Sequence, residues 1–210
     1  MDWKQMKTIN KPPYHIIVED FANQMIYDGS QLSSHFTAEK YGIIGDSILV
    51  FRGGMKLSPK EMVDIKDILR ESHLSNILIS SDDSLHFIIE EFDIQPPNME
   101  LEYYRLRILA QTVIDILKGK NIEIERKGTD IFVDGKKLNV GIATVGISSS
   151  KIHFGINILS TGVPEHVQAI GLTDLGVQTE EIQSLAIQIA EKYVSEISKI
   201  KEDIAKTRTI

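Results

Sequence analysis

Residues 130–158 read DIFVDGKKLNVGIATVGISSSKIHFGINI, and they predict three consecutive antiparallel strands. Asp134-Gly135 separates the first two strands, because an Asp-Gly pair between alternating hydrophobic residues is a strong signal for a two-residue hairpin. The glycine- and serine-rich residues 145–150 predict a second turn, between strands at 137–144 and 151–158. This stretch therefore indicates a β-meander.

One face of the last two strands combines polar side chains with glycines. Residues two apart share a face of a strand, and a hairpin centred near Ser148 would place Gly141 opposite Gly155 and Asn139 opposite Asn157. Glycines within strands often mark the close approach of a ligand or of another backbone. Two interpretations stay open: a face that receives an anionic or amide-bearing ligand, and a face covered tightly by a helix or loop. The predicted face consists of Lys137, Asn139, Gly141, His153, Gly155 and Asn157.

Composition restricts the class of protein. The chain has 210 residues, 42% of them hydrophobic, which predicts a globular protein of one domain with a sizeable core. It contains neither a long apolar run nor a secretory signal, so we expect no membrane partner and a cytoplasmic location. Cysteine is absent, which excludes disulfides, thiolate metal ligands and cysteine nucleophiles. The net charge of −7, without a basic stripe, argues against nucleic-acid binding.

Secondary-structure signals along the chain mix strands and helices without a repeating strand–helix–strand order, which is typical of the α+β class. We expect a mixed or antiparallel sheet with flanking helices. Residues 1–13 end in Pro12-Pro13 and predict a loose N-terminal arm, ahead of a single domain over 14–210. The apolar stripe of a long final helix forms either part of the core or the seam of a homodimer. Strands are predicted at 14–19, 24–27, 47–51, 76–80 and 122–125, and helices at 33–41, 59–71, 84–92, 99–118 and 180–206.

Three further groups of residues are candidates for a site. Arg52-Gly53-Gly54 follows an apolar strand, where glycine N–H groups and an arginine fork would suit phosphate or carboxylate, although a plain glycine turn has the same pattern. Ser30 lies in a polar run beside a predicted helix start, which either attracts an anion or only forms turns and caps. Three histidines each precede a phenylalanine and would bind a metal only if the fold gathered them, so we assign no metal ligand. They are His35, His86 and His153.

From residue 14 onward the chain resembles an uncharacterised prokaryotic family, domain of unknown function 366, in segments such as YDGSQLSSHF, GIIGDSILVFRG and LHFIIEEFD. Residues 121–158 also resemble biotin and lipoate protein ligases, through DGKKL followed by HFGIN. This second resemblance implies a class II aminoacyl-tRNA synthetase-type domain that activates a small carboxylic acid with ATP and transfers the acyl group to a protein lysine. It implies that Lys137 contacts the acyl-adenylate and that Arg52-Gly53-Gly54 takes the place of the phosphate loop. That loop has a single arginine here, and Val140 replaces a small residue of the ligase pattern.

Three functions follow as hypotheses. The first is an acyl-adenylate-forming ligase or transferase for a small carboxylic acid, with ATP as the candidate cofactor and Lys137 neutralising the reacting anions. The second is a non-catalytic protein that binds a small acid or a nucleotide on the same fold. The third is a histidine-based enzyme, metal-dependent in one version, that uses His35, His86 and His153, with His35 and His86 as the catalytic residues. The predicted ligand-binding residues are Ser30, Arg52, Gly53, Asn139, Gly141, His153, Gly155 and Asn157.

Overall fold

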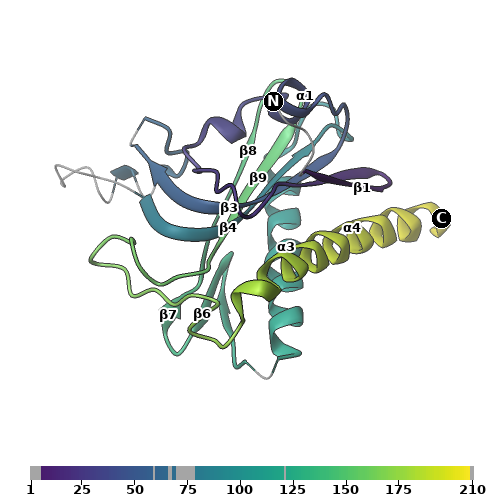
Figure 1. Cartoon of the computed structure of the whole chain (residues 1–210). Helices are drawn as coiled ribbons and strands as arrows, with labels where there is room; N and C mark the ends of the chain where they lie inside the picture. The colour runs from purple at the N-terminus through teal and green to yellow at the C-terminus, as the bar shows by residue number, and fades with distance from the viewer. Residues whose placement is uncertain (1–5, 59, 66–67, 70–78, 121, 209–210) are drawn as a thin grey trace.

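A six-stranded mixed sheet runs through the centre of the protein, shown in Figure 1 in a computed structural model that describes residues 6–58, 60–65, 68–69, 79–120 and 122–208. The strand order is β1-β2-β3-β4-β9-β8, and the pairing is antiparallel except between β2 and β3. The predicted α+β class and mixed sheet are confirmed. The strands are β1 Lys7–Lys11, β2 Tyr14–Val18, β3 Ser47–Leu57, β4 Ile79–Glu91, β8 Asn139–Val145 and β9 Ser150–Asn157.

The N-terminal part of the chain forms the first strand of this sheet. The prediction of a loose arm at 1–13 is wrong for Lys7–Lys11, which pair with β2 around a turn at Pro12-Pro13. The pairing covers the outer edge of β2, whose backbone groups would otherwise lack partners. Ile9 also packs against the main hydrophobic core, so this strand contributes to burial as well as to hydrogen bonding.

Both faces of the sheet are buried. Helices α3 Met99–Lys118 and α4 Ile182–Lys206 contact each other and pack on one face (Figure 1). Side chains of β3 alternate between two cores, because Ile48 lies under the helices whereas Leu49 belongs to a second core on the opposite face. The second core is covered by the segment between β2 and β3, which contains η2 Ser30–Leu32 and α1 Phe36–Tyr41. This two-sided burial explains the uninterrupted apolar run of β3.

The two long helices are confirmed where the sequence predicts them. The Asn98 side chain accepts a hydrogen bond from the Leu101 N–H and caps α3. The stripe of α4 is buried up to Ile197, whereas Ile200 and Ile204 are 37% and 70% exposed. The core interpretation therefore holds for most of the stripe, and a homodimer stays a prediction. No helix in the described part of the chain has the length and apolar character needed to cross a bilayer.

Strand β4 stands where a helix is predicted at 84–92. It is hydrogen-bonded to β3 on one side and to β9 on the other, so it is a central strand. Phe87 faces the helices and Ile88 faces the second core, and both are buried. A strand buried on both faces shows no alternation between polar and apolar residues, and a short apolar run is then ambiguous between strand and helix.

Other predicted elements differ in extent. The predicted strand at 24–27 reduces to one bridge between Tyr27 and Met55, and the helix predicted at 33–41 begins only at Phe36. The strand predicted at 122–125 is displaced to β5 Glu125–Lys127. The helix predicted at 59–71 and the strand predicted at 76–80 fall partly outside the described residues.

The Asp134-Gly135 hairpin is confirmed. Strand β5, β6 Asp130–Val133 and β7 Lys136–Lys137 form a small three-stranded sheet beside the main one. Asp134 and Gly135 have φ of 50° and 75°, the left-handed backbone that a two-residue type I′ turn requires. The turn pairs Phe132 with Lys137.

The second hairpin has a different register from the predicted one. Its turn is closed by Val145 and Ser150, so Gly141 lies opposite Phe154 and not opposite Gly155. A shift of one residue moves side chains to the other face of a sheet. The predicted ligand face is therefore wrong as a set: Asn139 and Gly141 turn toward α3, whereas His153, Gly155 and Asn157 turn toward the other face.

Candidate functional site

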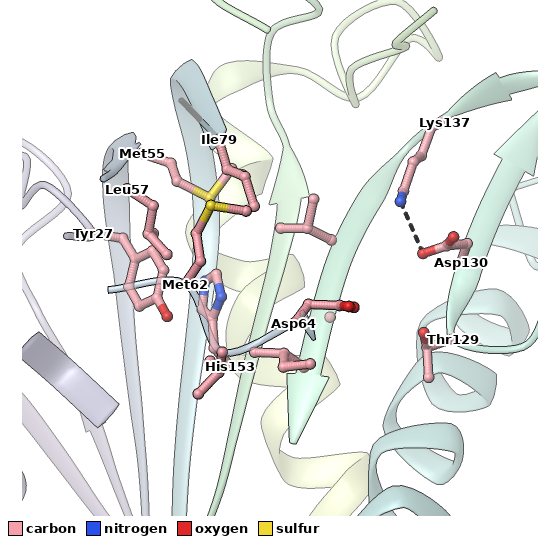
Figure 2. Close-up of a pocket in the computed structure, with 14 residues that line it drawn as sticks. Tyr27, Met55, Leu57, Met62, Asp64, Ile79, Thr129, Asp130, Lys137 and His153 are labelled. Carbon is pink, nitrogen blue, oxygen red and sulfur yellow. Dashed lines mark ion pairs between the residues drawn. The ribbon is translucent and has the colours of Figure 1, made fainter. Parts of the chain in front are cut away.

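A cavity of about 360 Å³ lies on the face of the sheet opposite the long helices. Figure 2 shows Lys137 and Asp130 on one side of it, with Tyr27, Met62 and His153 on the other. Its lining mixes apolar side chains with several polar and charged groups. The apolar lining includes Met55, Leu57, Met62, Ile79, Val140 and Ile142, and the polar lining includes Asp64, Thr129, Asp130, Lys137 and His153.

Lys137 is held in place by its main chain and its side chain. Its N–H donates to the Gln168 carbonyl at 2.8 Å, and its own carbonyl accepts from the Ile170 N–H at 3.0 Å. Its Nζ lies 3.1 Å from Asp130 Oδ1, and both side chains are about one-third exposed, at 31% and 34%. The lysine is therefore fixed at the rim of the cavity but open to solvent.

A second cavity of about 490 Å³ adjoins the first. The loop at 163–168 forms its far wall. The two cavities share part of their lining, so the Lys137–Asp130 ion pair lies at the boundary between them. The shared residues are Met55, Ile79, Asp130, Lys137 and Val140.

Two buried histidines form a hydrogen-bonded chain behind the first cavity. His86 Nδ1 lies 3.0 Å from His153 Nε2, and His86 Nε2 lies 3.2 Å from the Gly53 carbonyl oxygen. The Tyr27 ring stacks on the His153 imidazole, with ring centroids 3.6 Å apart and planes 13° apart. Burial lowers the pKa of His86 to about 4, and burial together with His86 lowers the pKa of His153 well below its usual value. Both imidazoles are therefore neutral near pH 7.

Arg52-Gly53-Gly54 does not form an open anion-binding loop. These residues lie inside β3, at a register shift between Gly53 and Met55. A Cβ at Gly53 would meet the Met25 carbonyl oxygen at 2.2 Å, so this glycine allows two backbones to approach closely. The Arg52 guanidinium donates to both carboxylate oxygens of Asp83, with Nη2 2.5 Å from Oδ2. The arginine fork that would bind phosphate is already occupied.

His35 and Ser30 lie apart from the cavity lined by Lys137. His35 is exposed at the start of α1, and its N–H donates to Glu90 at 2.8 Å. Ser30 Oγ donates to Asp28 at 2.6 Å, beside a shallow cavity that also includes Lys56. The prediction that His35 acts with His86 is therefore wrong, because the fold separates them. No group of three potential metal ligands occurs among the described residues.

The strand asparagines and glycines have structural roles. Asn139 is buried, accepts a hydrogen bond from the Ile131 N–H and donates to the Thr129 carbonyl. Asn157 donates to the Lys137 and Ile170 carbonyls and reaches only the second cavity. A Cβ at Gly141 would lie 3.0 Å from the Phe154 ring and 3.3 Å from Leu106 of α3, the close cover expected as the alternative to a ligand, although Gly141 also lines the first cavity. Gly155 instead makes room beside Val140, His153 and His86.

The cavity thus combines predicted and unpredicted residues. Lys137 and His153 line it from opposite sides, and His86 supports His153 from behind. Tyr27 and Met55 carry no pattern that marks them, because they come from different segments and meet at one isolated bridge. Asp130 was within reach of sequence reasoning, since the Asp134-Gly135 turn places Lys137 opposite Phe132, two residues from Asp130.

Comparison with known proteins places the chain in a family. The family described as domain of unknown function (DUF366) matches residues 16–208. The chain belongs to this family. An uncharacterised protein from Methanocaldococcus jannaschii is 38% identical over 192 residues, which cover 91% of this chain and 83% of that protein. A solved structure of a protein of unknown function from Pyrococcus horikoshi is 37% identical, with a TM-score of 0.83 over 94% of this chain and 99% of that one.

More distant structures share the fold of this DUF366 protein. Biotin protein ligase from Aquifex aeolicus, solved with biotin and ATP, gives a TM-score of 0.54 at 15% identity, over 88% of this chain and 72% of that one. A protein from T. acidophilum, proposed to be a lipoate protein ligase and solved with lipoic acid, gives a TM-score of 0.53 at 13% identity, over 81% of this chain and 83% of that one. At these identities the likeness establishes a biotin/lipoate ligase-like fold and nothing finer.

Proposed function

We propose that this protein binds a small carboxylic acid, or an activated form of it, in the first cavity and transfers its acyl group beside Lys137, whose ammonium stabilises the reacting oxygen. The observation that carries the proposal is the position of Lys137 at the boundary of two adjoining cavities. A transfer reaction needs room for an acyl donor and for an acceptor on the two sides of the reacting carbon. One fixed cation between them can serve both substrates.

The first cavity suits the acyl part. Met55, Leu57, Met62, Ile79 and Ile142 offer an apolar wall to a hydrocarbon chain or ring. Methionine side chains are flexible and adapt to irregular shapes. The Lys137 ammonium stands at the edge of this wall, where a carboxylate or an acyl carbonyl would come to rest.

Lys137 suits the chemistry at the boundary. When a nucleophile attacks an acyl carbonyl, the carbonyl oxygen gains negative charge before the leaving group departs, and a fixed cation stabilises that charge. Asp130 holds the Lys137 ammonium through the ion pair at 3.1 Å. The same ammonium would attract the free acid in the ground state.

The residues present do not fit the ATP site that the ligase resemblance implies. Arg52 is paired with Asp83, and Gly53 and Gly54 pack against backbone atoms of other segments. The proposed reaction therefore does not use a nucleotide. The arrangement favours transfer of an acyl group that arrives already activated, for example as a thioester, over formation of an acyl-adenylate.

Binding is tested by isothermal titration with hexanoic and octanoic acids. Lys137→Ala should weaken affinity roughly ten- to hundredfold, because a charge-assisted contact of about 1.5–3 kcal/mol is lost. Lys136→Ala is the matched control, since Lys136 is exposed on the same strand and lines neither cavity. Equal affinity of the two variants would contradict the proposal.

Chemistry is tested separately from binding. Free thiol released from an octanoyl thioester in the presence of an amine acceptor would report transfer, and pyrophosphate exchange with ATP would report the ligase form. A second candidate, a binding protein without chemistry, is favoured by the fact that Lys137, which lines both cavities, already has a carboxylate partner. Intact binding with neither thiol release nor exchange would establish that candidate and overturn acyl transfer.

A further inference from the structure

His153 lies on the side of the first cavity away from Lys137, where it lines the wall beside Tyr27 and Met62 (Figure 2). The His153 residue is only 3% exposed, so its side chain has little contact with bulk water. In the described structure its imidazole has one hydrogen-bond partner, His86. This imidazole therefore has one ring nitrogen still available.

The Gly53 carbonyl determines which nitrogen carries the proton. A carbonyl oxygen only accepts hydrogen bonds, so His86 Nε2, 3.2 Å away, must carry the hydrogen. Neutral His86 then has a lone pair on Nδ1, and His153 Nε2 must donate to it across 3.0 Å. Neutral His153 is left with a lone pair on Nδ1. A backbone carbonyl thus fixes the tautomers of two side chains in succession.

The orientation of this acceptor is fixed as well. Tyr27 stacks on the His153 ring at 3.6 Å, and Phe51 stacks on the His86 ring with centroids 4.7 Å apart. A flip of either imidazole would break the hydrogen bond between them. His153 Nδ1 is accordingly an acceptor of fixed orientation, which a donor on a ligand can pair.

We infer, on the basis of the proposed function, that the acid this protein binds carries an N–H or O–H donor remote from its carboxylate. His153 Nδ1 accepts a hydrogen bond from that donor. Lys137 then recognises the acidic end of the ligand, and His153 recognises the donor at the other end of the cavity. His86 does not contact the ligand. It is a positioning residue that holds His153 in the accepting tautomer.

The test uses matched ligands on the unmodified protein. Hexanoic and octanoic acids are compared with two derivatives of the same acids. In the first, called the alcohols, a hydroxyl group at the far end of the chain supplies a donor; in the second, called the ethers, that hydroxyl is methylated and has no donor. The alcohols should bind roughly ten- to hundredfold more tightly than the ethers, because an ether leaves the buried acceptor unpaired. Equal affinity of alcohols and ethers would overturn the inference and leave the proposed function intact. If no acid of any series binds, the proposed function fails and the inference falls with it.

Variants and a spectroscopic measurement separate recognition from folding. His153→Phe keeps an aromatic ring against Tyr27 and should abolish the preference for alcohols while unsubstituted acids still bind. Lys137→Ala should weaken all series alike. Nitrogen-15 spectra of the imidazoles at neutral pH need no variant, and they should show His153 Nδ1 unprotonated with its proton on Nε2. A protonated His153 Nδ1 would refute the inference even if the variants proved unstable.

Discussion

The Arg52 guanidinium and the Asp83 carboxylate face each other as a bidentate pair, with Nη2 2.5 Å from Oδ2. Their side chains are 18% and 5% exposed, so the pair is largely desolvated. The contact holds β3 against the neighbouring β4 and occupies the only arginine of the expected phosphate loop.

Breaking this pair should cost stability. Asp83→Asn leaves Arg52 with an uncompensated charge, and we expect a loss of roughly 2–4 kcal/mol in the free energy of unfolding, measured with urea. The double variant Arg52→Met with Asp83→Leu should recover most of that loss, because both charges are gone. A single variant as stable as the unmodified protein would show that the pair is solvated in solution.

Asp130→Asn tests the ion pair at the cavity boundary. Because both side chains are about one-third exposed, the effect on stability should stay below about 1 kcal/mol. Affinity for hexanoic acid should rise a few-fold, since the substitution removes a negative charge beside an anionic ligand. Glu125→Gln, which removes an exposed partner of Lys127, serves as the control and should leave affinity unchanged. A fall in affinity with Asp130→Asn would mean that Asp130 mainly positions the lysine.

The buried histidines make the fold sensitive to acid. His86 has an ordinary pKa of 6.5 and a folded-state pKa of about 4, so only the unfolded chain takes up a proton between these values. Stability is therefore full above pH 6.5 and falls as the pH drops toward 4, by about 2 kcal/mol at pH 5 from His86 alone. Thermal unfolding at pH 7 and pH 5 should show this loss. It should be smaller in His86→Gln but unchanged in His35→Gln, which alters an exposed histidine.

Glu102 should have the opposite pH dependence. It is fully buried, its carboxyl group lies within hydrogen-bonding reach of Glu91, and Arg105 Nη1 is 3.8 Å away. Burial and the charge of Glu91 raise its pKa to about 10. The folded state keeps a proton that the unfolded chain releases above pH 4.5, so stability falls as the pH rises from 4.5 toward 10.

Glu102→Gln should remove that alkaline loss. The variant should be more stable than the unmodified protein by about 1 kcal/mol or more at pH 8, and the difference should shrink toward pH 5. Glu100→Gln, on the exposed first turn of the same helix, should change neither value. A destabilised Glu102→Gln variant with an unchanged pH profile would show that Glu102 is ionised in the fold.

Sequence reasoning was most accurate where local chemistry determines structure. Asn98 and the Asp134-Gly135 pair set their helix and turn regardless of the rest of the chain, and both are confirmed. The turn after Val145 has no such fixed chemistry, and a register error of one residue there exchanged the faces of β8. The helix expected at 84–92 failed because burial on both faces of β4 is a property of the whole sheet.

The site could be predicted in part for the same reason. Lys137 and His153 lie on strands that the sequence places together, and both line the cavity. The ion pair between Arg52 and Asp83 forms because β3 pairs with β4. A helix predicted at 84–92 is incompatible with that pairing, so the sequence could not predict that Arg52 has a partner. Tyr27 reaches the cavity from an irregular segment, whose path only the tertiary structure defines.

The Gly53 carbonyl gives the cavity a property that its own side chains do not control. The atom that determines the hydrogen-bonding character of His153 belongs to the main chain, at a position where Met25 leaves space only for glycine. No tolerated side-chain exchange at that position can alter it. Under the proposed function, ligand preference would be open to redesign at His153 and His86, whereas the carbonyl that imposes the tautomer belongs to the main chain of the strand.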